Sequence, residues 1–425
     1  MARIIVAASP LSGHVLPMVL IGAHLQRCGH TVTVLTDEGH RDIVEHSRLA
    51  FEPLDPDACP AAPSSPSLLN RLLPNLIRRF RFGKADIRAT FIAPLAAQYR
   101  ALDRLIASTD VVLVDLAFTG ALTLLASDRP RPAVLVCGVG PLTLTSADTA
   151  PFGMAWTPRP GMDYGGMHLV VHRIMFRDIH NELNAALNSV GAACIDVSLM
   201  DWPRLADRML QLTVPDFEYP RRDLPDNVDF IGPVLAESAE GFQPPPWWAD
   251  VLHAETVVHV TQGTLDNGDF EQLMLPTMRA FAGRDDVVVV ATTGRGGMRR
   301  LPDRLPANVY AAEWISYSML LPHVDVMVTN GGYGGVQHAL RYGIPVVVAG
   351  ETADKAEVAA RVGHTGVGVN LGTAHPTPSA IVEAVREAGL CREAAARVGA
   401  EIARSTPLDA FTDAISARSR ALSAG

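Results

Sequence analysis

The sequence has few cysteines and aromatic residues, and it contains no long apolar run and no long basic run. Its five cysteines are odd in number and far apart, which argues against a disulfide framework and against a Cys-x-x-Cys metal site. This cysteine usage fits a reducing cytoplasm. The net charge of -9 argues against nucleic acid as a partner, because a phosphate backbone requires a basic face. Since no run of about 18 apolar residues is present, we also expect no integral membrane segment.

The composition is that of a soluble globular chain. Its 425 residues are 48% hydrophobic and 19% charged, and the length allows about two or three domains. The first forty residues predict a strand, a helix and a second strand, at residues 3–8, 19–28 and 31–36. The first turn, Ser9 to Pro17, lacks the Gly-x-Gly-x-x-Gly pattern, so the sequence does not predict dinucleotide binding there. Apolar runs predict two further strands at residues 111–114 and 133–136.

The second half repeats this α/β pattern. Strand-like runs occur at residues 257–261, 287–291, 326–328 and 345–349. A polar, proline-rich stretch separates the halves. We therefore predict an α/β protein of two Rossmann-like, doubly wound parallel-sheet domains facing a central cleft, where open α/β sheets bind ligands. The predicted domains span residues 1–234 and 249–407, with a linker at 235–248.

A glycine-rich turn is the most informative segment. It follows the run Val324–Val328 and contains four glycines, Gly331, Gly332, Gly334 and Gly335. Glycines permit positive φ values and let an anion approach the backbone, and the helix that follows would point its unpaired N–H groups at the same place. The turn therefore predicts a phosphate site. A purely structural turn is the alternative.

Several short motifs in one order give the chain its resemblance to a known family. It resembles the family 1 glycosyltransferases of the GT-B fold, and among them the bacterial macrolide-type enzymes that glycosylate natural products. The similarity runs over nearly the whole length. It rests on these segments: Ser12-Gly13-His14-Val15-Leu16-Pro17, Phe230-Ile231-Gly232-Pro233, Val260-Thr261-Gln262-Gly263-Thr264, Glu313-Trp314-Ile315, Leu320-Leu321-Pro322, the glycine turn, Gly343-Ile344-Pro345 and Asp354-Lys355.

The resemblance implies a catalytic pair. His14 occupies the position of the family's general base, for which an imidazole is suited because its pKa lies near the operating pH. Asp115 follows a later strand, as the family's partner carboxylate does, and would orient the imidazole. Asp110 begins the same strand and is the weaker candidate. A turn histidine bonded to backbone is the structural alternative for His14.

The resemblance also implies a donor site in the second half. Trp314 would stack on the nucleotide base, although a lone tryptophan is more often a core residue, and Thr264 would bind phosphate. Asp354 would hold sugar hydroxyls, whereas Lys355 replaces a glutamine and can only donate. The donor residues that we expect are Gly13, Gly263, Thr264, Trp314, Ile315, Asn330, Gly331, Gly332, Gly334, Gly335, His338, Asp354 and Lys355.

Two departures from the family pattern bear on the nucleotide. Asn330 replaces a histidine that contacts the diphosphate, and His338 replaces a glutamate that binds the ribose hydroxyls. Losing that glutamate matters less for a thymidine nucleotide, which lacks the 2′-hydroxyl. A dTDP-sugar therefore remains open beside UDP-glucose, which we favour.

The acceptor side lies in the first half. Residues 141–172 are rich in aromatic residues and methionine, a mixture suited to a pocket for a large apolar molecule, although core or lid packing explains it equally well. The basic tract at residues 78–84 is more simply a solvated helix face than a membrane contact. The acceptor-binding residues that we expect are Phe82, Phe118, Phe152, Met154 and Trp156.

Together these features predict an inverting, cytoplasmic hexosyltransferase, a monomer or homodimer with no cofactor. A nucleotide sugar would be its cosubstrate and a hydrophobic natural product its acceptor. No metal is expected, because the resemblance implies none and no acidic pair lies near the phosphate turn. A UDP-sugar epimerase and a non-catalytic glycosyltransferase partner are the alternatives. The final segment, residues 408–425, would pack back on the first domain.

Overall fold

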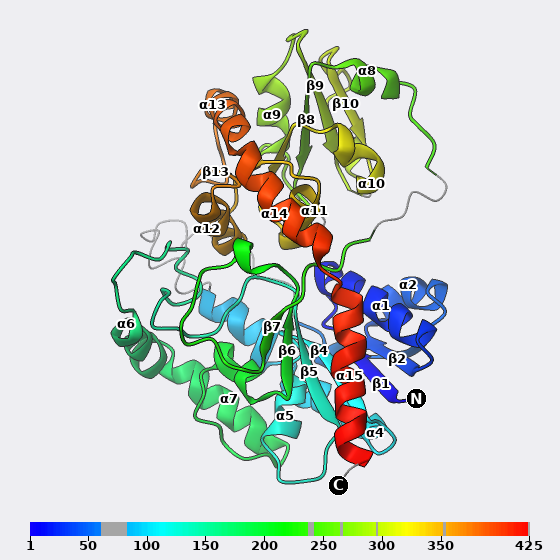
Figure 1. The fold of residues 1–425 in the computed structure, drawn as a ribbon, viewed down its shortest axis with the longest axis vertical. Coiled ribbons are helices and arrows are strands. Elements are labelled where there is room, and N and C mark those ends of the chain that lie inside the picture. Colours follow the sequence, from blue (N-terminus) through cyan, green and yellow to red (C-terminus); the bar gives the residue numbers. More distant parts are fainter. Residues whose placement is uncertain (61–82, 237–241, 264–266, 295, 352–353, 424–425) are drawn as a thin grey trace.

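The chain folds into two parallel α/β units, one above the other in Figure 1. The computed structural model describes all residues except 61–82, 237–241, 264–266, 295, 352–353 and 424–425. Within the described residues, no helix has the length and apolar character needed to cross a membrane.

The first unit is built on a seven-stranded parallel sheet in the order β3-β2-β1-β4-β5-β6-β7. Strand β1 pairs with β2 on one side and β4 on the other, with Ile4 opposite Val32 and Val111. Strands β2 and β3 are added on one side of β1 and the later strands on the other side, so the strand order reverses between β1 and β4. The strands are β1 (Arg3–Ala7), β2 (Thr31–Thr36), β3 (Ala50–Pro53), β4 (Val111–Asp115), β5 (Ala133–Gly138), β6 (Arg208–Gln211) and β7 (Val228–Phe230).

The second unit repeats this topology with six parallel strands, in the order β10-β9-β8-β11-β12-β13. Its reversal lies between β8 and β11, where Val258 stands opposite Val326. The strands are β8 (Thr256–Thr261), β9 (Val287–Thr292), β10 (Val309–Ala312), β11 (Val326–Thr329), β12 (Val346–Val348) and β13 (Gly368–Asn370).

Helices pack on the faces of both sheets (Figure 1). Every residue of β4 and β5 is buried, as expected for central strands covered on both faces. The α-helices are α1 (Ser12–Arg27), α2 (Arg41–His46), α4 (Leu95–Ile106), α5 (Leu122–Leu125), α6 (Gly165–Val170), α7 (Arg177–Ser189), α8 (Trp248–His253), α9 (Met274–Ala280), α10 (Tyr317–Leu320), α11 (Tyr333–Arg341), α12 (Lys355–Thr365), α13 (Pro378–Ala388), α14 (Arg392–Arg404) and α15 (Pro407–Ser423).

The last helix belongs to the first unit although the second unit precedes it in sequence. Phe411 and Ile415 of α15 are completely buried in the cluster that contains Val15, Met18 and Ile21 of α1. Figure 1 shows α15 running from the second unit down along the first. The chain therefore passes between the units a second time, between α14 and α15.

The apolar runs predicted the central strands, whereas the short outer strands were missed. Strands β1, β2, β4, β5, β8, β9, β11 and β12 are confirmed within a residue or two. Strands β3, β6, β7, β10 and β13, of three or four residues each, were not predicted. The predicted turn up to Pro17 was wrong, since α1 begins at Ser12 and includes Pro17. It begins there because the Leu11 carbonyl accepts from the N–H groups of His14 and Val15.

Candidate active site between the two sheets

The predicted site residues gather where the strand order of each sheet reverses. In the first unit, His14 lies in the first turn of α1, which follows β1, and Asp115 ends β4. In the second unit, Gly263 follows β8 and Asn330 follows β11. Ligands of open α/β sheets bind at the carboxyl ends of the strands at this reversal point. The topology therefore places both sets of residues at ligand-binding edges.

His14 and Asp115 form a hydrogen-bonded pair. The Nδ1 atom of His14 lies 2.9 Å from Oδ1 of Asp115. Backbone N–H groups of Ser9 and Ala117 donate to the same carboxylate, at 2.5 and 2.8 Å. Asp115 is completely buried, whereas about 25% of the His14 side chain is exposed. The carboxylate is therefore fixed inside the first unit, and the imidazole that it orients reaches the surface of the cleft.

The pKa values of the pair move in opposite directions. Burial alone would raise the pKa of Asp115, but His14 and the two backbone donors outweigh it and lower that pKa. Burial would lower the pKa of His14, but the Asp115 carboxylate outweighs it and raises that pKa. Asp115 is therefore ionised at neutral pH and accepts the proton of Nδ1. This tautomer leaves Nε2 as the basic nitrogen of a neutral His14.

Asp354 of the second unit lies close enough to His14 for each to shift the pKa of the other. It stands at the N-cap position of α12 without a side-chain cap bond, and its Oδ2 atom lies 3.9 Å from the Cβ position of Gly140, in the loop after β5. Burial raises the pKa of Asp354, while the nearby His14 lowers it. The half-buried carboxylate of Asp354 therefore interacts electrostatically with the imidazole of His14 in the other unit. This electrostatic interaction places the predicted base and a predicted sugar-binding residue near each other.

The two glycine turns of the second unit lie side by side. The Nδ2 atom of Asn330 donates to the Gln262 carbonyl at 2.5 Å, and Asn330 Oδ1 lies 3.8 Å from the Cβ position of Gly263. Gly263 and Gly331 have positive φ values of 69° and 87°. The turns after β8 and β11 therefore form one continuous edge. Thr264 lies outside the described residues.

The glycines of the predicted phosphate turn differ in what they permit. A Cβ on Gly331 would lie 2.8 Å from Val348 and 3.2 Å from the Lys355 carbonyl, so this position needs glycine for internal packing. A Cβ on Gly334 would have no atom within 4 Å. Gly332 and Gly335 also leave space, with nearest atoms at 3.9 and 3.7 Å. Gly332, the N-cap residue of α11, has no side chain to cap the helix, so the first N–H groups of α11 are candidates to bind a phosphate.

Three other predicted donor residues, Trp314, Ile315 and His338, differ in how exposed they are. Trp314 follows β10 and is 74% exposed, so its indole is open to a ligand, while Ile315 is buried. His338 lies on α11, half-buried, with its ring edge-on to Tyr317 at 5.0 Å. Burial lowers the pKa of His338 to about 4, so it is neutral at pH 7. Gly13 is exposed in the first turn of α1.

The helix after the phosphate turn is attached to the first unit, which the sequence did not indicate. Gln211 of β6 donates to the Tyr333 hydroxyl at 3.3 Å, and Gln337 donates to Thr213 at 2.8 Å. Tyr333 and Gln337 are both buried. The start of α11 is therefore positioned by both units.

The predicted acceptor residues are scattered. Phe118 is completely buried in the first core, where its ring packs against protein. Phe152 and Met154 are half-buried, and Trp156 is 54% exposed. Trp156 and Met162 line a cavity of about 480 Å³ whose opposite wall includes Ala360 and Gly363 of α12. Phe82 and most of the basic tract lie outside the described residues, and Lys84 pairs with Asp178 at 2.6 Å.

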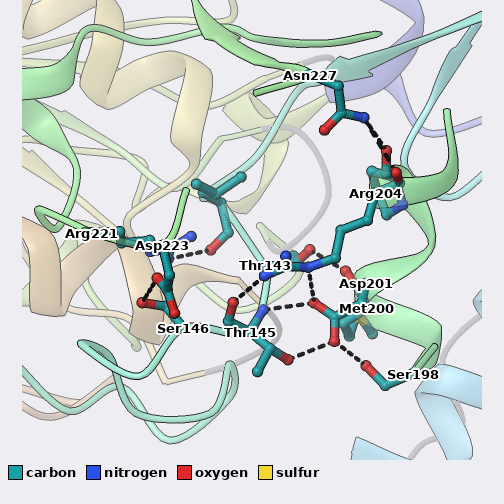
Figure 2. A network of polar contacts seen from close by, with 12 residues as sticks. Thr143, Thr145, Ser146, Ser198, Met200, Asp201, Arg204, Arg221, Asp223 and Asn227 are labelled. Carbon is teal, nitrogen blue, oxygen red and sulfur yellow. Dashed lines mark hydrogen bonds and ion pairs between the residues drawn. The ribbon is translucent and has the colours of Figure 1, made fainter. Parts of the chain in front are cut away.

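A polar network holds the loop between β5 and α6 (Figure 2). The Asp201 carboxylate accepts from the Thr145 N–H at 2.7 Å and from the Thr145 and Ser198 hydroxyls at 2.6 and 2.7 Å. Asp223 accepts from Ser146 at 2.5 Å, and Arg221 donates to the Leu142 carbonyl at 3.2 Å. The base of the loop is therefore rigidly attached to the first unit.

Comparison with known proteins identifies the family. Residues 277–415 match the model of the C-terminal domain of erythromycin biosynthesis protein CIII-like proteins. The chain is 38% identical over 382 residues to 4'-demethylrebeccamycin synthase of Lentzea aerocolonigenes, covering 87% of each chain. It is 33% identical over 401 residues to UDP-glucosyltransferase A1 of Starmerella bombicola, covering 90% of this chain and 84% of the relative.

A solved structure shares the whole fold. The crystal structure of the glycotransferase of kitacinnamycin matches with a TM-score of 0.70 at 23% identity, over 98% of each chain. The two parallel sheets, each with a reversal in its strand order, are thus those of the GT-B fold. Together with the sequence relatives, they show that the chain belongs to the family 1 glycosyltransferases of natural-product biosynthesis.

Proposed function

We propose that this glycosyltransferase is an inverting enzyme that moves glucose from UDP-glucose onto a hydroxyl of a hydrophobic natural product, such as a macrolide, an ansamycin or an aromatic polyketide. The observation that carries the proposal is the His14–Asp115 pair at the cleft with Asp354 of the other unit near it. A base from one unit and a sugar-binding carboxylate from the other are what transfer across such a cleft needs.

In the proposed reaction, Nε2 of neutral His14 takes the proton of the acceptor hydroxyl. The hydroxyl oxygen forms a bond to the anomeric carbon while the bond from that carbon to the diphosphate oxygen breaks. Attack from the face opposite the leaving group inverts the anomeric centre. Asp115 remains ionised and stabilises the imidazolium that forms.

The nucleoside diphosphate leaves with its bonding electron pair. The first N–H groups of α11 would stabilise this charge, with Gly332, Gly334 and Gly335 allowing close approach. We propose that these donors act without a metal ion. Trp314 would hold the base, and Asp354 would accept hydrogen bonds from the sugar.

The donor is proposed from two considerations. The relative from Starmerella bombicola is named a UDP-glucosyltransferase, which supports UDP-glucose. His338, where the family has a glutamate, instead supports a dTDP-deoxysugar. A neutral histidine can accept a hydrogen bond from only one ribose hydroxyl, whereas a carboxylate can accept from both.

The test is to incubate the purified protein with UDP-glucose or dTDP-glucose and a set of hydroxylated macrolides and aromatic polyketides. Mass spectrometry should detect acceptor carrying one hexose, and NMR should show inversion at the anomeric carbon. Conversion of the nucleotide sugar to an isomer without acceptor would instead support an epimerase. Binding of nucleotide with no turnover of any acceptor would favour a non-catalytic partner.

A further inference from the structure

Helix α12 carries a buried ion cluster immediately after the proposed sugar-binding residues. Glu357 and Arg361 lie about one and two turns beyond Asp354, and both are almost completely buried. Their carboxylate and guanidinium are 3.0 Å apart. Arg361 also pairs with Glu218 of the first unit at 2.9 Å and lies over the ring of Tyr219. The cluster therefore joins α12 to the first unit.

The second oxygen of Glu357 binds the backbone of a loop of the first unit. Its Oε1 atom accepts from the N–H groups of Gly153 and Ala155, at 2.7 and 2.8 Å. Charge-assisted hydrogen bonds of this kind are about twice as strong as neutral ones. Arg361 compensates the buried charge of Glu357, so the carboxylate can serve both partners.

The loop is held in a conformation that needs such a partner. Gly153 has a φ of 95°, and Ala155 has a φ of 55°, which is uncommon for a residue with a side chain. Successive N–H groups in a left-handed turn converge on one point and form an anion-binding concavity. Glu357 occupies that point, so the acid of one unit fixes the backbone of the other.

This loop carries the proposed acceptor residues. Phe152, Met154 and Trp156 alternate with the two residues that Glu357 binds. The cavity beside Trp156 has its other wall on the same helix, at Ala360 and Gly363. One helix thus presents the proposed sugar-binding residue at its start, the loop anchor next and a cavity wall beyond it.

We propose that Glu357 is a positioning residue that sets the acceptor loop, residues 151–156, relative to the donor-bearing helix α12. The inference rests on the proposed function where it assigns this loop to the acceptor. Glu357 touches neither substrate in this account. It determines acceptor binding through the loop backbone.

The test compares Glu357→Gln and Glu357→Ala with the parent. The matched control is Glu383→Gln, which removes an exposed carboxylate that pairs with Arg386 on α13. Hydrogen exchange should become at least tenfold faster at residues 152–156 in Glu357→Ala and remain unchanged in β4 and β5. The KM for the acceptor should rise at least tenfold, while kcat and the KM for the nucleotide sugar change less than threefold. Glu357→Gln should be milder, because its amide oxygen still accepts.

A second variant approaches the loop from its own side. Gly153→Ala leaves the ion cluster intact, and its added Cβ would have no atom within 4 Å, but it opposes the positive φ. It should raise loop exchange and acceptor KM in the same way. Unchanged loop exchange in both Glu357→Ala and Gly153→Ala would overturn the proposal, as would an equal rise in the KM for both substrates. Hydrogen exchange and the affinity for UDP can both be measured without an acceptor. They therefore test the role of Glu357 in the loop even if the proposed transfer reaction fails.

Discussion

The imidazole of His14 and the carboxylate of Asp115 meet at 2.9 Å although 101 positions separate them in the chain. His14 lies in the first turn of the helix after β1 and Asp115 ends β4, and these two strands are neighbours in the sheet. The parallel topology therefore assembles the pair from two distant turns.

Replacing His14 with alanine should lower kcat by about two to four orders of magnitude, because a positioned general base contributes about that factor. Nucleotide affinity should change little, since His14 belongs to the other unit from the phosphate turn. Steady-state kinetics and calorimetric titration with UDP measure the two effects. Activity within a few-fold of the parent would remove His14 from the mechanism.

The pH profile should report the raised pKa of His14. The base acts when neutral, so kcat/KM should fall as the pH decreases through a value above the ordinary 6.5. Asp115→Asn removes the charge that raises this pKa, so the acid limb should move to lower pH while the maximal rate falls. An acid limb that stays in place in Asp115→Asn would show that another group titrates.

Trp314→Ala should weaken UDP or dTDP binding by about 1–3 kcal/mol, the range of base–aromatic stacking. The side chain is 74% exposed, so its removal should not affect the thermal midpoint. Leu390→Ala, on an 83% exposed residue of the same unit, is the control for binding. Equal nucleotide affinity in parent and Trp314→Ala would contradict the assignment of the base site.

The donor nucleotide can be decided at His338. If the donor is UDP-linked, His338→Glu should preserve or improve UDP binding relative to dTDP, because a carboxylate accepts from both ribose hydroxyls. If it is dTDP-linked, the added charge near the diphosphate should weaken binding. Competition between UDP and dTDP on both proteins measures this. A parent that prefers dTDP tenfold, about 1.4 kcal/mol, would overturn the proposed UDP-glucose donor.

The last helix should stabilise the first unit and not the second. Phe411→Ala removes a completely buried ring, and such changes cost about 3–5 kcal/mol. Hydrogen exchange should accelerate in α1 and β1 while β8 and β11 keep their protection. Loss of protection confined to the second unit would contradict this packing.

The short motifs placed the candidate site residues directly after the central strands, which is where the structure has them. The central strands are continuous apolar runs because both faces are covered, and the turns that follow them carry His14, Gly263 and Asn330. The outer strands were missed because they are short and mixed in polarity, as in Val228–Phe230, whereas the equally short β12 is wholly apolar.

No local pattern in the sequence indicated the contacts between the two units. Glu357 and Arg361 are four positions apart, a spacing that is typical of an exposed helix pair. Glu218, Tyr219 and the loop at Gly153, all supplied by the other unit, cover the pair. Phe118 shows the same limit, since an aromatic residue after a strand gives no sign of whether it faces a pocket or the core.

Both passages of the chain between the units lie against each other at one point. A Cβ on Gly232, just before the linker, would lie 2.0 Å from Oγ of Ser405, which follows α14. The two connections hold the units together at this point, and the contacts of Arg361 with Glu218 and of Tyr333 with Gln211 fix their relative orientation. Because Phe411 and Ile415 of α15 are buried in the first unit, the second unit of a chain cut within the linker would still be attached to the first unit through α15, in addition to the contacts of Arg361 and Tyr333.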